Sequence, residues 1–214
     1  MKLTKTVAVA ALILSPVSSA NVLGFGGGME FNVLNPSYEL KSGSIEGKEG
    51  GTTGVTLHLE HPLPFLPNAR FDSLTVKGGD SFKYNQHNFT GYYRLLDIDI
   101  VKVNAGAGIT NISGTKWMGE ADKLDKNAGH IFAEGEARLP FTGISTYASL
   151  LKATGSKYSG MDNRIGLRYT LDVAGIEPSA SVGYRYVKQE FRNIDSNKEE
   201  MIASGMYLNL KVAF

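Results

Sequence analysis

Apolar and polar residues alternate along the end of the chain. Counting back from the last residue in steps of two gives only apolar side chains: Phe214, Val212, Leu210, Leu208 and Met206. The residues between them include Asn209 and Lys211. A period of two with one apolar face predicts a β-strand.

The same alternation recurs along most of the chain. Six further segments show it clearly, at 23–33, 55–60, 101–110, 130–139, 164–171 and 180–186. Three weaker segments complete the set: 69–77, 89–96 and 146–152. The first of these changes phase near Ser73, which suggests a β-bulge, and Leu96 interrupts the polar side of the second. The third has strand composition but no clear face. These segments predict ten strands, or eight if the weak ones merge.

The apolar faces of the clear strands carry no charge. A strand of a soluble sheet tolerates an occasional Lys or Glu on either face. On a lipid-facing strand, Arg or Lys at the bilayer midplane costs about 2–4 kcal/mol. The strict exclusion of charge therefore favours strands that face lipid.

The connections between strands alternate in kind. One set is short and mostly contains proline, at 61–68, 97–99, 139–143 and 174–178. The other set is polar and generally longer, at 35–51, 78–84, 113–128, 155–160 and 193–200. Short periplasmic turns and longer extracellular loops are typical of outer-membrane barrels, and an even strand number puts both chain ends on the periplasmic side. We therefore predict an all-β fold, a transmembrane antiparallel up-and-down β-barrel over 21–214.

The first twenty residues have the pattern of a secretory signal peptide. A basic start at Lys2 and Lys5 is followed by an unbroken apolar run from Val7 to Leu14, and small residues end the segment at Ala20. We predict a cleavable signal peptide over 1–20 and export from the cytoplasm. The chain has no Cys, and its net charge of +1 gives no electrostatic reason to bind nucleic acid.

With this leader, these strands and the terminal aromatic residue, the chain resembles the small outer-membrane β-barrels of Gram-negative bacteria, the OmpX-like and OmpW-like group. The resemblance covers the whole predicted mature chain. It implies an outer-membrane location, contact with membrane lipid and lipopolysaccharide, and delivery by periplasmic chaperones to the barrel-assembly machinery. In that group the final strand is the assembly signal, which here ends in Phe214. Tyr207 departs from the pattern because it falls on the polar side of that strand.

The predicted inner face is rich in charge. The charged residues predicted to face the lumen are Glu30, Glu60, Arg94, Lys102, Glu134, Glu136, Arg138, Arg164, Arg168, Arg185 and Lys211. Arg70 and Asp72 belong to the same set, which then holds eight cations and five carboxylates. A barrel of eight to ten strands is just wide enough for side chains to fill, so mutual pairing and a structural role is the simplest interpretation. The excess of cations leaves open a narrow passive channel for small solutes that favours anions.

An outer-membrane hydrolase acting on lipid or peptide is the alternative function. His58 and Glu60 share one inner face, while His130 and Glu134 share another, and both histidines are expected near the extracellular rim. Against this, the four histidines have no metal-ligand spacing and no G-x-S-x-G motif occurs. The sequence predicts no catalytic residue, no metal and no cofactor.

Replacing Phe214 with Asp is expected to lower the amount of folded protein in the outer membrane, because the substitution puts a charge at the end of the strand that closes the barrel. Phe214→Tyr and Phe214→Trp keep the ring and are expected to be mild. Cell fractionation measures all three variants. A normal outer-membrane level of the Asp variant would contradict the role of Phe214 as an assembly signal.

Overall fold

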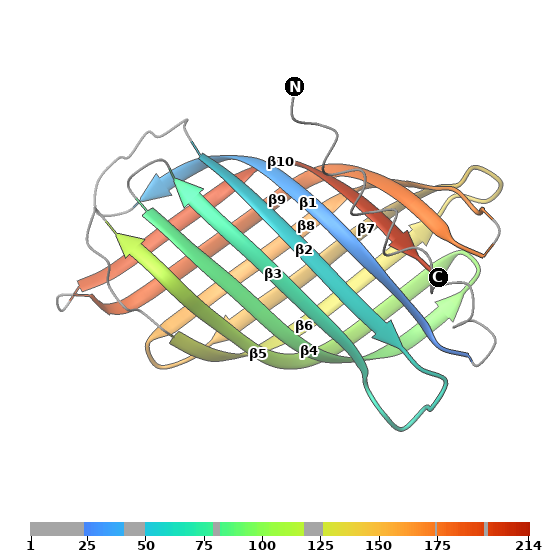
Figure 1. Ribbon diagram of the computed structural model, residues 1–214, viewed down its shortest axis with the longest axis horizontal. Helices are drawn as coiled ribbons and strands as arrows, with labels where there is room; N and C mark the ends of the chain where they lie inside the picture. Colours follow the sequence, from blue (N-terminus) through green and yellow to red (C-terminus); the bar gives the residue numbers. More distant parts are fainter. Residues whose placement is uncertain (1–23, 41–49, 79–81, 118–125, 174, 195–196) are drawn as a thin grey trace.

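The computed structural model of the chain is a single antiparallel β-barrel (Figure 1). It describes residues 24–40, 50–78, 82–117, 126–173, 175–194 and 197–214, so the signal peptide predicted over 1–20 lies outside the described residues. The strands are β1 (Gly26–Leu40), β2 (Gly50–Glu60), β3 (Asn68–Gly78), β4 (Phe82–Ile98), β5 (Val101–Trp117), β6 (Lys126–Arg138), β7 (Ile144–Thr154), β8 (Tyr158–Thr170), β9 (Glu177–Ile194) and β10 (Asn197–Ala213). The described part of the chain contains no helix long and apolar enough to cross a membrane.

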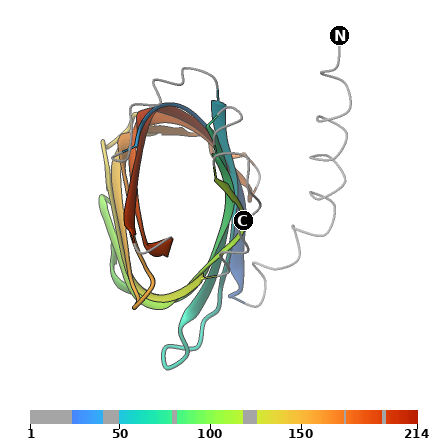
Figure 2. The ribbon, with the colours of Figure 1, turned by 90° about the vertical axis from the view of Figure 1, so that its left-hand side faces the viewer.

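Each strand pairs with its sequence neighbours, and β1 also pairs with β10. The sheet therefore closes on itself, as the end-on view shows (Figure 2). At the seam the backbone groups of Gly27 and Phe214 exchange hydrogen bonds of 3.0 and 2.9 Å. The prediction of ten antiparallel up-and-down strands is confirmed, and the alternative of eight is wrong.

The two ends of the barrel differ in their connections. We call the end with the connections at 61–67, 99–100, 139–143 and 171–176 the turn end; Phe214 also lies there. The opposite end, where β1 ends and β2 begins, is the loop end. Several strands are longer than the sequence pattern predicted: β4, β5, β9 and β10 each span 17 or 18 residues.

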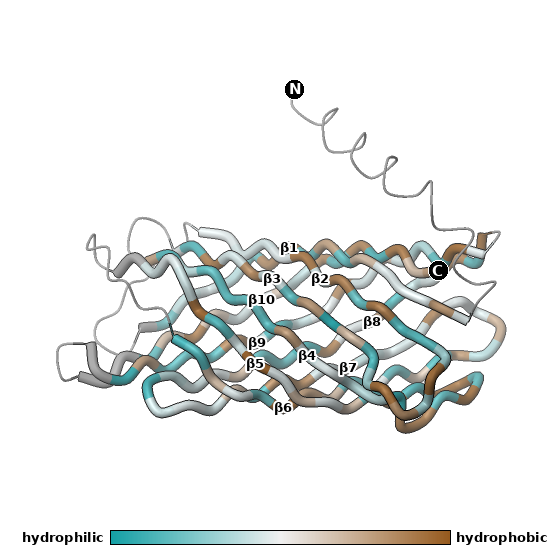
Figure 3. Tube along the Cα trace, turned by 60° about the horizontal axis from the view of Figure 1, so that its bottom comes forward, coloured by the Kyte–Doolittle hydropathy of each residue, from teal (hydrophilic) through white to brown (hydrophobic). Residues whose placement is uncertain are grey.

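In the half of the barrel next to the turn end, polar side chains face inward and apolar side chains face outward. On β8, Leu167 is 53% exposed on the outside, whereas Arg168, the next residue, is 6% exposed inside. Other strands follow the same rule, and the alternation of hydrophilic and hydrophobic residues is visible along the tube (Figure 3). This half has the polarity expected of a barrel in lipid.

In the half next to the loop end, this polarity is reversed. On β3, Arg70 and Asp72 face inward near the turn end, and the inner face then continues with the buried Leu74 and Val76. The outward position beyond them is the exposed Lys77. This half therefore has an apolar interior and a polar exterior, as a water-soluble barrel does.

The β-bulge predicted near Ser73 is wrong, and the reversal of polarity explains the pattern that suggested it. The pairing of β3 runs without a register shift from Asn68 to Gly78 against β4, and from Ala69 to Gly78 against β2. The change of phase in the sequence comes from a change in what the interior contains, while the backbone stays regular.

The structure explains three irregularities in the sequence pattern. A register shift between Arg94 and Leu96 places Leu96 opposite Val103, which explains why Leu96 interrupts the polar side. β7, which had no clear face in the sequence, alternates strictly in burial from Ile144 to Thr154. Tyr207 is 3% exposed and faces inward, where its ring meets that of Tyr147 edge-on at 6.3 Å.

The two faces of β8 give opposite expectations for neighbouring substitutions. Leu167→Arg is expected to block or strongly destabilise membrane insertion, by about 2–4 kcal/mol, because it puts a charge on the outward face. Arg168→Leu is expected to leave the barrel assembled with altered stability. Heat-modifiable gel mobility reports the folded barrel for both, and equal tolerance of the two substitutions would contradict the assignment of the faces.

Candidate functional site

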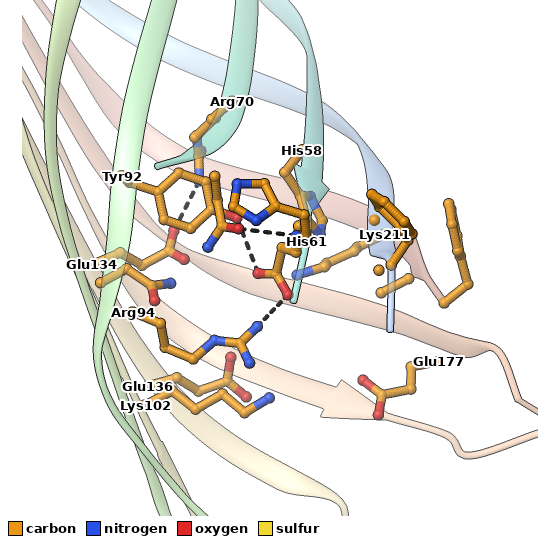
Figure 4. Close-up of a pocket in the computed structure, with 18 of the residues that line it drawn as sticks. His58, His61, Arg70, Tyr92, Arg94, Lys102, Glu134, Glu136, Glu177 and Lys211 are labelled. Carbon is orange, nitrogen blue, oxygen red and sulfur yellow. Dashed lines mark hydrogen bonds and ion pairs between the residues drawn. The ribbon is translucent and has the colours of Figure 1, made fainter. Parts of the chain in front are cut away.

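The inner face near the turn end encloses a cavity of about 640 Å³. Strands from all around the barrel contribute to it, together with the turn that contains His61 and Pro64. Figure 4 shows charged side chains from several strands pointing into this one space, among them Arg94, Lys102 and Glu136. We call it the turn-end cavity.

The charges that line the turn-end cavity balance. Its six basic residues are Arg70, Arg94, Lys102, Arg138, Arg168 and Lys211. Its six acidic residues are Glu30, Glu60, Glu134, Glu136, Asp172 and Glu177. The excess of cations that the sequence suggested for the interior is therefore absent from this cavity, so its lining has no net preference for anions.

Near the mouth of the cavity, Glu60 is the centre of a small network. Its carboxylate pairs with the guanidinium of Arg94 and accepts a hydrogen bond of 3.0 Å from the hydroxyl of Tyr92. Arg94 also pairs with Asp97 at 2.7 Å. The side chains of Glu60, Arg94 and Asp97 are between a quarter and two-fifths exposed, so each ion pair contributes little stability by itself.

Deeper in the barrel the ion pairs are buried and have strong geometry. Arg185 donates from Nε and Nη2 to the two carboxylate oxygens of Asp162 at 2.9 and 2.6 Å, which is a bidentate pair. Its remaining Nη1 donates to Asn32 at 2.9 Å. On the opposite wall Arg70 donates from Nε and Nη2 to Asp72, at 3.0–3.1 Å, and Thr56 donates to the same carboxylate at 2.6 Å.

Contacts between β3 and β8, and between β4 and β9, cross the full width of the barrel, because the strands of each pair lie five positions apart in the ring of ten. Arg164 on β8 lies 3.9 Å from Asp72 on β3. Gln189 on β9 donates a hydrogen bond of 2.8 Å to Gln86 on β4. The rings of Tyr84 and Phe191 meet with their centroids 6.2 Å apart. Opposite walls of the barrel are thus in direct contact.

The loop-end half of the interior is filled by an apolar cluster, which we call the apolar plug. Its members are Tyr38, Leu74, Val76, Phe82, Tyr84, Ile112, Ala128, Leu151, Ala153, Tyr158, Val187, Phe191, Met201 and Ala203. Val76, Ile112 and Met201 have no exposed surface. The buried ion pairs and then the apolar plug therefore lie between the turn-end cavity and the loop end of the barrel.

The structure places all eleven predicted interior charges on the inner face. It joins Glu136 to Arg168 at 2.6 Å and to Arg138 at 3.6 Å, and it joins Lys211 to Glu30 at 3.6 Å. Glu134 pairs with Arg70 at 3.1 Å. Among the described residues, Lys102 pairs with Asp97 alone, at 3.8 Å.

Sequence reasoning missed Asp162, which makes the most deeply buried ion pair. The sequence pattern predicts a loop at 155–160 and a strand at 164–171 and assigns no element to the residues between them, whereas β8 begins at Tyr158. The inward phase Tyr158, Gly160, Asp162, Arg164 continues the pattern of the rest of the strand and is the signal that could have found it.

The two candidate histidines lie in different environments. His58 lines the turn-end cavity, whereas His130 is 4% exposed, and its two ring nitrogens lie 2.9 Å from the hydroxyls of Thr90 and Thr110. His58 lies near the turn end of β2 and so does not reach the rim at the loop end. Within the residues that the structure describes, no group of three His, Asp or Glu side chains could hold a metal ion.

Comparison with known proteins yields structural alignments at low sequence identity only. No family model matches the chain, and no curated protein matches it. Among solved structures, the β domain of the Bordetella autotransporter BrkA aligns at 11% identity over 88% of this chain and 98% of that one, with a TM-score of 0.46. The outer membrane protein OpdK from Pseudomonas aeruginosa aligns at 9% identity over 89% of this chain and 66% of that one, with a TM-score of 0.29.

The buried pair of Asp162 and Arg185 is expected to dominate the stability of the interior. Asp162→Leu leaves the Arg185 charge without its main partner and is expected to lower the free energy of unfolding by about 3–5 kcal/mol. Asp162→Leu combined with Arg185→Met removes both charges and is expected to recover most of that loss.

Urea unfolding of the refolded protein in detergent measures the loss. The matched control is Glu200→Gln, which breaks the half-exposed pair with Lys188 at 3.1 Å and is expected to cost less than about 1 kcal/mol. Equal losses for Asp162→Leu and Glu200→Gln would contradict the expectation.

Proposed function

We propose that this chain is an integral outer-membrane β-barrel of a Gram-negative bacterium with a closed lumen and a structural role. The outward apolar band of the turn-end half supports a location in lipid. On β10 and the residue that follows it, the band runs from Met206 to Phe214. These eight residue-to-residue steps, at about 3.3 Å each and a tilt of 35–45°, span roughly 20 Å. That height is close to the roughly 25 Å typical of such bands.

We propose that the turn end faces the periplasm and the loop end faces the outside. The short connections at the turn end support this orientation, because outer-membrane barrels keep short turns on the periplasmic side. The assembly machinery, periplasmic chaperones, membrane lipid and lipopolysaccharide remain the partners in this proposal. Membership of the OmpX-like and OmpW-like group also remains a proposal.

The contacts between opposite walls are the observation that supports a closed lumen and hence a structural role. In a narrow passive channel, three contacts between opposite walls would have to break at the same time. They are the ion pair of Asp72 with Arg164, the hydrogen bond of Gln189 to Gln86, and the ring contact of Tyr84 with Phe191. Burial supports their persistence, because separating them would remove hydrogen bonds and an ion pair from inside the barrel and would expose apolar side chains of the plug to water. We therefore favour the structural role over the passive channel.

The proposal assigns no enzymatic activity to the chain. Both ring nitrogens of His130 are occupied by threonine hydroxyls, and the side chain is buried. His58 belongs to the turn-end cavity, far along the barrel from the rim where a hydrolase of outer-leaflet lipid would act. No other arrangement of side chains in the described part favours a hydrolase.

The refolded protein is expected to give no steady conductance steps in a planar lipid bilayer. A variant with Asp72→Ser, Arg164→Ser, Tyr84→Ala and Phe191→Ala removes contacts from both closures and is expected to conduct intermittently. The outward substitution Tyr184→Ala is the control and is expected to be silent.

Heat-modifiable mobility verifies that each protein is a folded barrel before its current is recorded. Steady steps from the unmodified protein would contradict the closed lumen and favour the passive channel.

A further inference from the structure

We propose that the outer wall of β3 and β4 carries a binding site for a phosphorylated glycolipid of the outer leaflet, the class to which lipopolysaccharide belongs. The site is centred on Lys77 and Lys83. The inference rests on the proposed membrane location and orientation, and it names a partner for one particular surface of the barrel.

The two lysines are direct partners across neighbouring strands. Lys77 on β3 and Lys83 on β4 are paired in register, and both lie on the outward phase of their strands. Side chains at directly opposite positions start about 5 Å apart, so the two ammonium groups can converge on one anion. The register places a third lysine, Lys116 on β5, opposite Lys83.

Like charges at directly opposite positions destabilise a sheet unless something neutralises them. Among the described residues, no carboxylate lies within ion-pair distance of Lys77 or Lys83. By contrast, Lys188 on the opposite wall lies 3.4 Å from Glu190 and 3.1 Å from Glu200. The two lysines on β3 and β4 thus differ from Lys188, which has two acidic neighbours. An external anion would remove the repulsion between Lys77 and Lys83.

The wall beneath the lysines is polar but uncharged. Thr75 donates a hydrogen bond of 3.0 Å to Asn85, and one step further from the lysines Asn111 on β5 donates to Asn127 on β6 at 2.8 Å. These hydroxyl and amide groups face outward and are suited to the hydroxyl groups of sugars. The apolar band begins only below them, at the paired rings of Phe71 and Phe89, whose centroids lie 4.8 Å apart.

The height of Lys77 and Lys83 above the apolar band indicates which class of lipid could reach them. Lys77 lies six residues beyond Phe71, which corresponds to roughly 15 Å along the barrel axis for a tilted strand. The headgroup region of a phospholipid layer is only about 5–8 Å thick on each side. A phospholipid phosphate would lie too low, whereas a lipid with phosphorylated sugars extends to this height.

The test compares binding of purified lipopolysaccharide by the full chain and its variants in detergent. Lys77→Gln and Lys83→Gln are each expected to weaken binding about five-fold, and the double variant about 30-fold, since each lysine near an anionic surface contributes a comparable increment. The control is Lys152→Gln, which changes an exposed outward lysine on β7 that has no lysine opposite. It is expected to leave binding unchanged.

Two further probes identify what is bound. Lipopolysaccharide from which the phosphates have been removed is expected to bind the unmodified protein as weakly as the intact lipid binds the double variant. Phosphatidylglycerol is expected to bind equally to the unmodified protein and the double variant.

Unchanged binding by the double variant, or an equal loss with Lys152→Gln, would overturn the site. A loss of phosphatidylglycerol binding confined to the double variant would assign the surface to a phospholipid and would also overturn it. Heat-modifiable mobility and membrane fractionation are recorded for every variant. A barrel that fails to enter the membrane contradicts the proposed function, whereas an inserted barrel that binds no glycolipid contradicts the site alone.

Discussion

The pairing of β1 with β10 is the interaction on which the rest of the structure depends. It runs in one register from Gly28–Ala213 to Leu40–Met201 and continues into the reciprocal hydrogen bonds between Gly27 and Phe214. A closed sheet has no free edge, so every strand has two partners and each residue has a fixed side. Once the register is set, the side of each residue follows from the period of two.

The polarity of the inner and outer faces changes along the barrel. Near the turn end the outside is apolar and the inside is charged, and near the loop end the two are exchanged. Strands such as β3 cross the boundary without any change in their hydrogen bonding. The two halves stabilise the fold differently: ion pairs with satisfied hydrogen bonds fill one interior, and close apolar packing fills the other.

Sequence patterning predicted the class of fold, the strand number and the side of most residues, because alternation that recurs in segment after segment is a strong local signal. The prediction failed where the apolar residues move from the outer face to the inner face. At Leu74 and Val76 the apolar residues move to the inner phase, which in the sequence is indistinguishable from an inserted residue. Leu96 was unexplained because a bulge depends on the pairing with β5, which no local pattern contains.

The candidate site was less accessible to prediction than the fold. Alternation identified which charges face inward, but their partners depend on which strands lie opposite in a ring of ten. Arg164 meets Asp72 only because β8 and β3 are diametrically opposed, and Gln86 is separated from Gln189 by 103 positions in the sequence. The balance of charge in the turn-end cavity likewise required the complete lining, including residues of the turns such as Asp172.

Several of the interior charges have a partner on their own strand, two residues away on the same face. Arg70 and Asp72 form such a pair on β3, and Arg138 and Glu136 form another on β6. A contact of this kind can form in a single extended strand, before any neighbour is present. Contacts across the barrel can form only after the ring has closed. A strand that brings its own counter-charge can therefore enter a growing sheet nearly neutral, so the order in which strands are added is less constrained by the charges that the finished barrel encloses.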